Sequence, residues 1–157
     1  MINETVKNPL VSVIMNCHNG EIYLKESINS LINQTYKNWE MIFWDNASTD
    51  NSKKILDKFN DERIKYFKSN KFTSLYEARN LSIEKAQGEY ISFLDTDDLW
   101  IKDKIEKQIY FLEKNKEYKI VYSNFFVLDE NKNKKYIRHK ISLPSGSITQ
   151  SLLEIIK

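Results

Sequence analysis

Glycine, proline and cysteine are scarce in this sequence of 157 residues, which contains three glycines, two prolines and one cysteine. Such scattered glycines do not make a phosphate-binding loop. The chain has no Gly-x-x-x-x-Gly-Lys-Ser/Thr segment, and no Gly-x-Gly-x-x-Gly segment follows its first apolar run. The common glycine-rich nucleotide loops are therefore excluded. The single cysteine, Cys17, excludes an internal disulfide and is typical of a reducing compartment.

The sequence also lacks a long apolar run and a large excess of charge of one sign. No stretch is apolar for long enough to cross a bilayer, and the N-terminus has no signal-peptide core. Lys and Arg number 24 against 22 Asp and Glu, and the basic residues are scattered among the acidic ones. These features predict a cytoplasmic protein that does not bind nucleic acid. Its length fits a single domain over residues 1–157.

The sequence does contain a regular alternation of strand-like and helix-like segments. Strands are expected over residues 10–15, 39–44, 63–68, 90–94, 119–128 and 135–141. Five helices are expected between or after these strands. The first begins at residue 21, the second follows a cap at Ser48 or Thr49, and the third covers residues 75–87 with Gly88 as its C-cap. The fourth covers residues 99–115, and the fifth begins at residue 147. This order predicts the α/β class, with helices on both faces of a mostly parallel sheet that an antiparallel hairpin at one edge makes mixed.

Residues 88–100 are the segment around which the other motifs are arranged. An apolar strand over 90–94, expected to be covered on both faces, runs directly into Asp95, Asp97 and Asp98. Ligands of open α/β sheets bind beyond the carboxyl ends of the strands. Adjacent carboxylates repel one another unless a cation neutralises them, and oxygen ligands suit Mg²⁺ or Mn²⁺. From these residues alone, an Asp-rich turn that caps the next helix remains an equal alternative.

Five segments together give the chain a family resemblance. Residues 11–19, 30–36, 44–50, 78–80 and 86–98 resemble, in order and spacing, the motifs of family 2 glycosyltransferases. The resemblance implies the GT-A fold, a Rossmann-like three-layer sandwich that holds a nucleotide sugar and a divalent metal, Mn²⁺ or Mg²⁺.

The resemblance also implies roles for individual residues. In the Asp-X-Asp motif it assigns Asp97 to the metal and Asp95 to the ribose or sugar, and Asp98 extends the motif as a second metal ligand. Asp45 and Asn46 match a pair of acids near the base; Asn46 keeps an acceptor oxygen for a pyrimidine N3–H.

The remaining implied residues belong to the first loop and the third helix. The resemblance places Asn16 and His18 beside the nucleotide; the family usually has Pro or Thr at the position of Asn16 and Tyr at the position of His18. It also implies that Arg79 faces the phosphates. The residues themselves leave other interpretations open. Asp45 can cap the following helix, His18 can be a packing substitute for Tyr, and Arg79 can pair with Glu77 or Glu84.

The function implied is transfer of a sugar from a nucleotide-diphosphate donor, with UDP favoured, to a glycan or lipid-linked acceptor, with inversion. The general base is expected beyond Lys157, so the chain is interpreted as truncated before the acceptor-binding part. The alternative is a non-catalytic nucleotide-sugar-binding module. The apolar face of the helix that starts at residue 147 predicts a partner, either a further segment or a second copy of the chain. Family members often act at the inner face of a membrane, which implies peripheral association.

Overall fold

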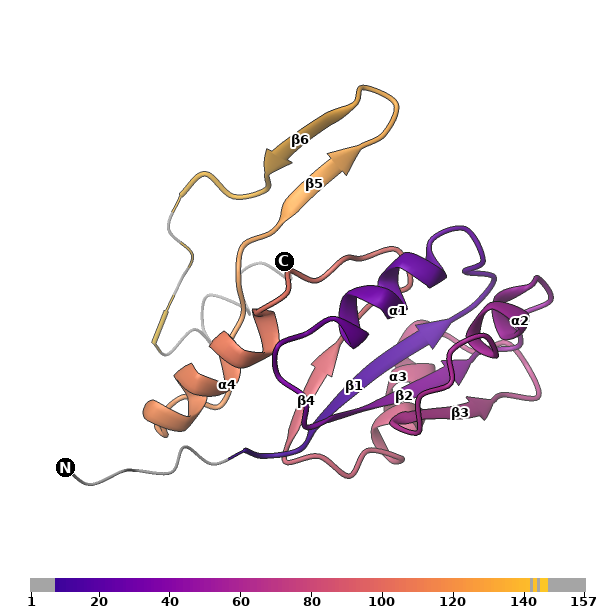
Figure 1. Cartoon of the computed structure of the whole chain (residues 1–157), viewed down its shortest axis with the longest axis horizontal. Helices are drawn as coiled ribbons and strands as arrows, with labels where there is room; N and C mark the ends of the chain where they lie inside the picture. Colours follow the sequence, from indigo (N-terminus) through magenta and orange to yellow (C-terminus); the bar gives the residue numbers. More distant parts are fainter. Residues whose placement is uncertain (1–7, 142, 144, 147–157) are drawn as a thin grey trace. The chain divides into compact units, whose positions relative to one another are not determined.

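The structure, a computed structural model, describes residues 8–141, 143 and 145–146. It divides into two units between Ile109 and Tyr110. The first unit contains β1 (Val11–Cys17), α1 (Leu24–Ile32), β2 (Trp39–Asp45), α2 (Ser52–Leu56), β3 (Ile64–Lys68), α3 (Leu75–Ile83), β4 (Tyr90–Phe93) and the start of α4 (Lys104–Lys114) (Figure 1). The second unit contains the rest of α4 and a hairpin of β5 (Phe126–Asp129) and β6 (Lys134–Ile137). The helix and the dimer contact expected from residue 147 onward lie outside the described residues.

The sheet of the first unit has four parallel strands in the order β3-β2-β1-β4. The chain moves outward from β1 through β2 to β3 and then returns past β1 to β4. Because crossovers between parallel strands are right-handed, this reversal places α3 on the face opposite to α1 and α2 (Figure 1). The predicted α/β class, with helices on both faces, is confirmed.

Alternate residues of the central strand β1 supply the two faces of the sheet. Val13 and Met15 join the apolar core with Leu24 and Ile28 of α1. On the opposite face, Asn16 contacts α3 through Ser82. A central parallel strand is covered on both sides, which explains why its sequence is a continuous apolar run.

Strand β4 lies at one edge of the four-stranded sheet and differs from its prediction. Leu94, just after it, is fully buried, but Ile91 and Phe93 are 43% and 46% exposed. The expectation that this strand is covered on both faces is therefore wrong for these two residues. Only β1 pairs with β4 among the described strands, so its outer edge lacks a neighbour there.

Gly88 has a different role from the predicted helix cap. Helix α3 ends at Ile83 with Glu84 as its C-cap, four residues earlier than Gly88. The Gly88 N–H donates to Ser12 Oγ at 2.8 Å. A Cβ on Gly88 would lie 2.5 Å from Ser12 N and 2.8 Å from Leu10 O. The sequence therefore needs glycine here because the chain passes close to the β1 backbone.

Three helices begin later than the sequence predicts, and the first of them, α1, starts at Leu24 rather than at residue 21. The N-cap of α2 is Asn51, so neither Ser48 nor Thr49 caps it. Helix α4 begins at Lys104 rather than at Leu99. The buried amide of Gln34 sets this start, because it donates to Ile101 O at 2.8 Å and accepts from Ile105 N–H at 3.1 Å.

The hairpin of the second unit forms a two-stranded antiparallel sheet of its own. Its antiparallel pairing is as predicted. The strand predicted over 119–128 is shorter in the structure, where β5 covers Phe126–Asp129.

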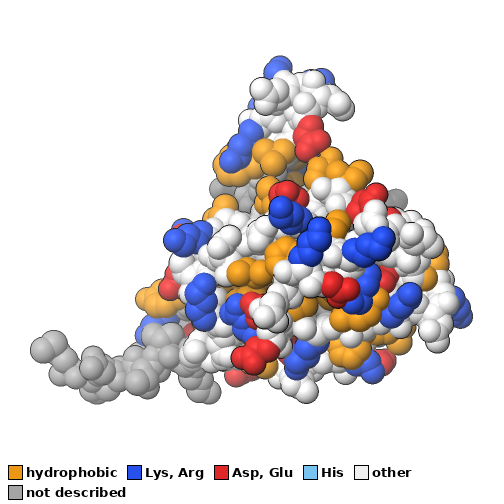
Figure 2. Space-filling view, turned by 45° about the vertical axis from the view of Figure 1, so that its right-hand side comes forward, with side chains coloured by type: hydrophobic (Ala, Val, Ile, Leu, Met, Phe, Trp, Pro, Cys, Tyr) orange, Lys and Arg blue, Asp and Glu red, His pale blue; other side chains and the backbone are white. Residues whose placement is uncertain are grey.

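The surface carries mixed charge. Figure 2 shows Lys and Arg side chains spread over the visible face and interspersed with Asp, Glu and apolar side chains. The scattering of basic residues in the sequence is thus also a scattering in space on this face.

Candidate functional site

The carboxyl ends of the four parallel strands meet at one edge of the sheet. Residues 18–21 follow β1, residues 46–52 follow β2, residues 69–74 follow β3 and residues 95–98 follow β4. The first three segments are called the cross-linked loops below, and residues 95–98 the acid loop. The strand order reverses between β1 and β4, and such a switch point is where open α/β sheets bind ligands.

Asn46 joins two of the cross-linked loops. Its side chain is 5% exposed. Its Nδ2 donates to Thr73 O at 2.8 Å, and its Oδ1 accepts from Thr73 N–H at 3.1 Å and from Thr73 Oγ1 at 3.0 Å. Both ends of the amide are thus engaged within the chain. The oxygen predicted to meet a pyrimidine N3–H instead holds the loop that follows β3.

Asp45 is also engaged within the chain, at 2% exposure. Its Oδ1 accepts from Ser48 N–H at 2.7 Å, and its Oδ2 accepts from the Tyr66 hydroxyl at 2.8 Å. Burial, reinforced by this hydrogen bond and by the negative charge of Asp45, raises the pKa of Tyr66 above its ordinary value. In the structure Asp45 closes the turn after β2; it does not cap α2.

Asn16 and His18 lie at the end of β1 but make different contacts. Asn16 Nδ2 donates to Ser82 Oγ at 2.7 Å, so this side chain connects β1 to α3. His18 Nδ1 lies 2.9 Å from Asn46 O, and its ring packs against Phe72 with centroids 4.5 Å apart. Cys17 between them is fully buried, and burial raises the pKa of its thiol, as expected for an unreactive packing residue.

The loops after β1 and β2 are held together by side-chain to backbone hydrogen bonds. Asn19 Oδ1 accepts from Thr49 N–H at 2.8 Å, and Asp50 Oδ2 accepts from Glu21 N–H at 2.9 Å. Two residues here adopt the left-handed conformation, Asn19 with φ 54° and Ala47 with φ 59°. Asn tolerates this region, whereas Ala is strained in it.

Arg79 on α3 pairs with the acid loop. Its guanidinium donates to Asp95 Oδ1 at 2.8 Å and lies 5.3 Å from the centre of the Phe93 ring. This partner replaces both alternatives from the sequence, Glu77 and Glu84. Arg79 and Asp95, from two separate motifs, are thus brought into one ion pair.

Asp97 and Asp98 are exposed, and neither carboxylate accepts a hydrogen bond from any residue that the structure describes. Partial burial raises the pKa of Asp98, the charges of Asp95 and Asp97 raise it further, and Lys104 opposes them. Burial lowers the pKa of Lys104 to about 8, against the effect of Asp98. The acid loop is therefore a place where a further positive charge would be stabilised.

A ready-made metal cage is absent from the described residues, since no three His, Cys, Asp or Glu side chains are grouped to hold an ion. Mg²⁺ in nucleotide-dependent sites is commonly bound by one or two carboxylates together with substrate phosphates. Asp97 and Asp98, with their free carboxylates, match the protein's part of such a set.

Sequence reasoning missed Phe72, Thr73 and Lys104 as residues of this edge. Phe72 is an aromatic residue in an otherwise polar loop, which was the one available signal. Lys104 approaches Trp100, with Nζ 3.9 Å from the ring centre, and Asp98 through the turn before α4. Nothing in the sequence indicates the bonds between Thr73 and Asn46, because they depend on the spatial order of the strands.

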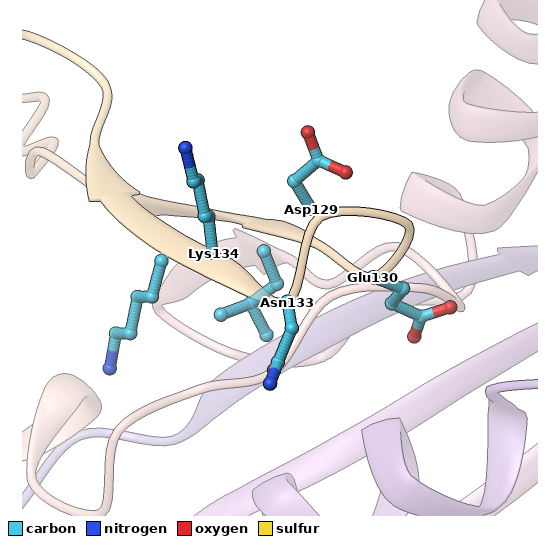
Figure 3. Close-up of a pocket in the computed structure, with 6 residues that line it drawn as sticks. Asp129, Glu130, Asn133 and Lys134 are labelled. Carbon is cyan, nitrogen blue, oxygen red and sulfur yellow. The ribbon is translucent and has the colours of Figure 1, made fainter.

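Two hollows lie elsewhere. The one in Figure 3 has a volume of about 260 Å³ and is lined by residues of the hairpin, including Asp129 and Lys134. Another, of about 310 Å³, lies between α1 and α2 and includes Ile22 and Phe59. Neither contains a residue that the sequence assigned to the site.

Comparison with known proteins identifies the class of this α/β chain. A match to the family described as Glycosyl transferase family 2 covers residues 12–155. The chain therefore belongs to glycosyl transferase family 2, and the predicted resemblance is confirmed.

Particular relatives are longer than this chain. Two are beta-1,3-glucosyltransferases of Escherichia coli, WfgD and WfaP, each named for transfer from UDP-Glc to alpha-D-GlcNAc-diphosphoundecaprenol. WfgD is 38% identical over 78% of this chain and 48% of its own length; WfaP is 40% identical over 75% and 47%. The chain spans about half the length of these relatives.

Among solved structures, S. aureus TarS 1-349 in complex with UDP-GlcNAc matches with a TM-score of 0.65 and 28% identity, over 68% of this chain and 32% of that one. A mannosyltransferase of Pyrobaculum calidifontis, solved with GDP-Man and Mn²⁺, matches with a TM-score of 0.61 at 23% identity, over 66% and 32%. The second likeness shows the fold alone. Together with the parallel sheet, these matches confirm the predicted GT-A fold.

Proposed function

We propose that this chain is the donor-binding part of a glycosyltransferase that moves a sugar from a UDP-sugar to a lipid-linked or other glycan acceptor. The observation that carries the proposal is the pair of exposed, unbonded carboxylates of Asp97 and Asp98 at the switch point of a family 2 chain. The UDP-GlcNAc bound by TarS and the UDP-Glc named for WfgD support the choice of donor. The diphosphoundecaprenol-linked sugar named for WfgD supports the choice of a lipid-linked acceptor.

In this proposal, Asp97 and Asp98 hold one divalent cation, Mn²⁺ or Mg²⁺, together with the donor's diphosphate. A cation held by these two residues would supply Lewis-acid stabilisation of the negative charge that develops on the departing diphosphate oxygen. Asp95 turns toward the ribose or sugar, and Arg79 fixes its carboxylate through the 2.8 Å ion pair. Arg79 is thereby a positioning residue first, and a phosphate contact only if the ion pair opens.

The roles assigned to the first two strand ends follow the hydrogen bonds of the structure. Asn16, Asp45 and Asn46 shape the nucleotide site by fixing its walls, since their side chains are bonded to Ser82, Tyr66 and Thr73. His18 lies beside the nucleotide as part of one wall.

The general base and the acceptor site are assigned to parts of the protein beyond Lys157. The greater length of the relatives supports this assignment. An inverting transferase needs a base to take the proton of the acceptor hydroxyl, and the residues given roles above all serve the donor. The described residues contain no helix long and apolar enough to cross a membrane. A lipid-linked acceptor, as named for WfgD, would place the protein at the inner membrane face.

The test is calorimetric titration of UDP, GDP, CDP and dTDP into the full chain, with and without Mn²⁺. UDP is expected to bind tightly only with Mn²⁺ present, and Asp97→Asn is expected to abolish that metal-dependent binding. Asp57→Asn is the matched control, because Asp57 is an exposed acid at the C-cap of α2 that pairs with Lys53 of that helix. Metal-independent binding, or equal losses in both variants, would contradict the assignment.

A further inference from the structure

Phe72 is an exposed aromatic side chain at the carboxyl edge to which neither the motifs nor the donor chemistry assign a role. It lies in the loop between β3 and α3 and is 62% exposed. One side of its ring packs on His18, with centroids 4.5 Å apart and planes tilted by 55°. The rest of the ring is open to solvent at the ligand-binding edge of the sheet, where an aromatic face can pack against a flat ligand group.

The loop that carries Phe72 is fixed on both sides of the ring. Thr73, the next residue, makes three hydrogen bonds with the buried amide of Asn46. Before the ring, Ser69 N–H donates to Asp45 O at 2.8 Å, and Ser69 Oγ donates to Lys71 O at 2.6 Å. The ring is therefore presented by an ordered backbone, and little conformational entropy is lost when a ligand packs on it.

The two polar side chains at the end of β2 are already engaged in hydrogen bonds within the chain. The Asn46 amide is bonded to Thr73 and the Asp45 carboxylate to Ser48 and Tyr66. A flat, partly apolar ligand group entering here would meet a ring face more readily than a free hydrogen-bonding side chain. A nucleobase is such a group, because every base has a π face that stacks on aromatic side chains.

The position of Phe72 relative to the acid loop also fits a nucleotide. The loop of Phe72 follows β3, the acid loop follows β4, and the strand order is β3-β2-β1-β4. Three strand spacings separate these ends, or roughly 14 Å. An extended nucleoside diphosphate can place its base at one end of this edge and its phosphates beside Asp97 at the other.

We infer that Phe72, supported by His18, is the surface on which the nucleobase of the donor stacks. This inference rests on the proposed function and adds to it a base-binding residue. It also assigns two separate roles at the base: stacking on Phe72 contributes affinity, and the engaged amide of Asn46 acts by holding the loop in place.

The inference is tested by titrating UDP and inorganic pyrophosphate, each with Mn²⁺, into the wild-type chain, Phe72→Ala, Phe72→Tyr and Phe126→Ala. Pyrophosphate reports the metal and phosphate site without a base. Phe126 is the matched control, an exposed phenylalanine of the hairpin at 55% exposure. Phe72→Ala is expected to weaken UDP binding by about tenfold and to leave pyrophosphate binding unchanged. Phe72→Tyr keeps the ring and should bind UDP like the wild type.

The outcomes separate this inference from the proposed function. If the wild type binds UDP and Phe72→Ala binds it equally well, or loses pyrophosphate to the same extent, stacking on Phe72 is wrong while donor binding stands. If the folded wild-type chain binds none of UDP, GDP, CDP and dTDP, both are wrong. The urea unfolding midpoint of Phe72→Ala should match the wild type, because an exposed ring contributes little to stability.

Discussion

The cross-linked loops and the acid loop share one edge of the sheet but are built differently. In the cross-linked loops, Asn19, Asn46 and Asp50 each bond to a neighbouring loop or turn, and the backbone is held in a strained conformation at Ala47. In the acid loop, Asp97 and Asp98 are exposed, and no described residue donates a hydrogen bond to their carboxylates. The hydrogen bonding of the cross-linked loops is complete without a ligand. In the acid loop, by contrast, like charges repel one another, and a bound cation would reduce that repulsion.

This difference shows which part of the site folding alone can order. Amide and backbone groups satisfy one another, so the loops after β1, β2 and β3 close with the fold. Clustered carboxylates need a positive partner from elsewhere. Substitutions of the hydrogen-bonded side chains in the cross-linked loops should therefore affect stability, and substitutions of the carboxylates in the acid loop should mainly affect ligand binding.

The largest effect on stability is expected for Asn46→Ala. The change leaves the N–H, hydroxyl and carbonyl of buried Thr73 without the bonds that Asn46 supplies. We expect a loss of about 2 kcal/mol in the free energy of unfolding, measured with urea. Asn60→Ala is the control, because Asn60 is exposed. Equal losses in the two variants would remove the distinction between the regions.

A smaller effect of opposite sign is expected for Ala47→Gly. Ala47 has φ 59°, and a Cβ in the left-handed region is unfavourable. Glycine relieves that strain but loses more entropy on folding, so the expected net gain is about 0.5 kcal/mol. A higher urea midpoint at an unchanged m value would show it. Ala86→Gly, where φ is not positive, should give no gain.

The smallest effect concerns the pH dependence of stability. The pKa of Asp98 is raised in the folded chain by partial burial and by neighbouring acids. The folded state therefore holds this proton more tightly than the unfolded state, and stability falls as the pH rises from the ordinary value of 3.8 through the raised pKa. Asp98→Asn should remove that decline and be slightly more stable than the wild type at neutral pH in urea titrations without metal.

Glu40 provides the contrasting slope. Burial alone would raise its pKa, but bonds from Lys65, Ser12 and Gln87 N–H outweigh burial and lower it. Its contribution to stability is present above the ordinary value of 4.5 and is lost as the pH falls through the lowered pKa. Glu40→Gln should reduce this loss of stability at acid pH. The same sign of slope for Glu40 and Asp98 would contradict the account of their surroundings.

Much of the fold could be predicted because it depends on local patterns. The apolar runs of β1 and β2 and the polar clusters at their ends are sequence-local and were placed within two residues. The site was likewise located at the strand ends by general rules of α/β sheets. The motifs of family 2 then assigned Asp95 and Asp97 their roles as predictions.

The rest depended on which segments become neighbours. In the sequence, Gly88 has the position of a helix cap. Its actual role, the close approach to Ser12, depends on the three-dimensional path of the chain and cannot be read from the sequence. The amide of Gln34 delays the start of α4 across a separation of 71 residues. Arg79 pairs with Asp95 rather than with an acid on its own helix, because α3 brings its guanidinium close to the end of β4. The exposure of Ile91 and Phe93 follows from the place of β4 in the strand order.

The most direct test of the difference between the two regions is amide hydrogen exchange over residues 46–50 and 95–98, with and without UDP and Mn²⁺. The account predicts that residues 46–50 are protected in the free chain and change little. Residues 95–98 should exchange fast in the free chain and gain protection only when UDP and Mn²⁺ are both present. An acid loop already protected without ligand, or an equal gain in both segments, would contradict the claim that folding completes one region and a bound cation the other.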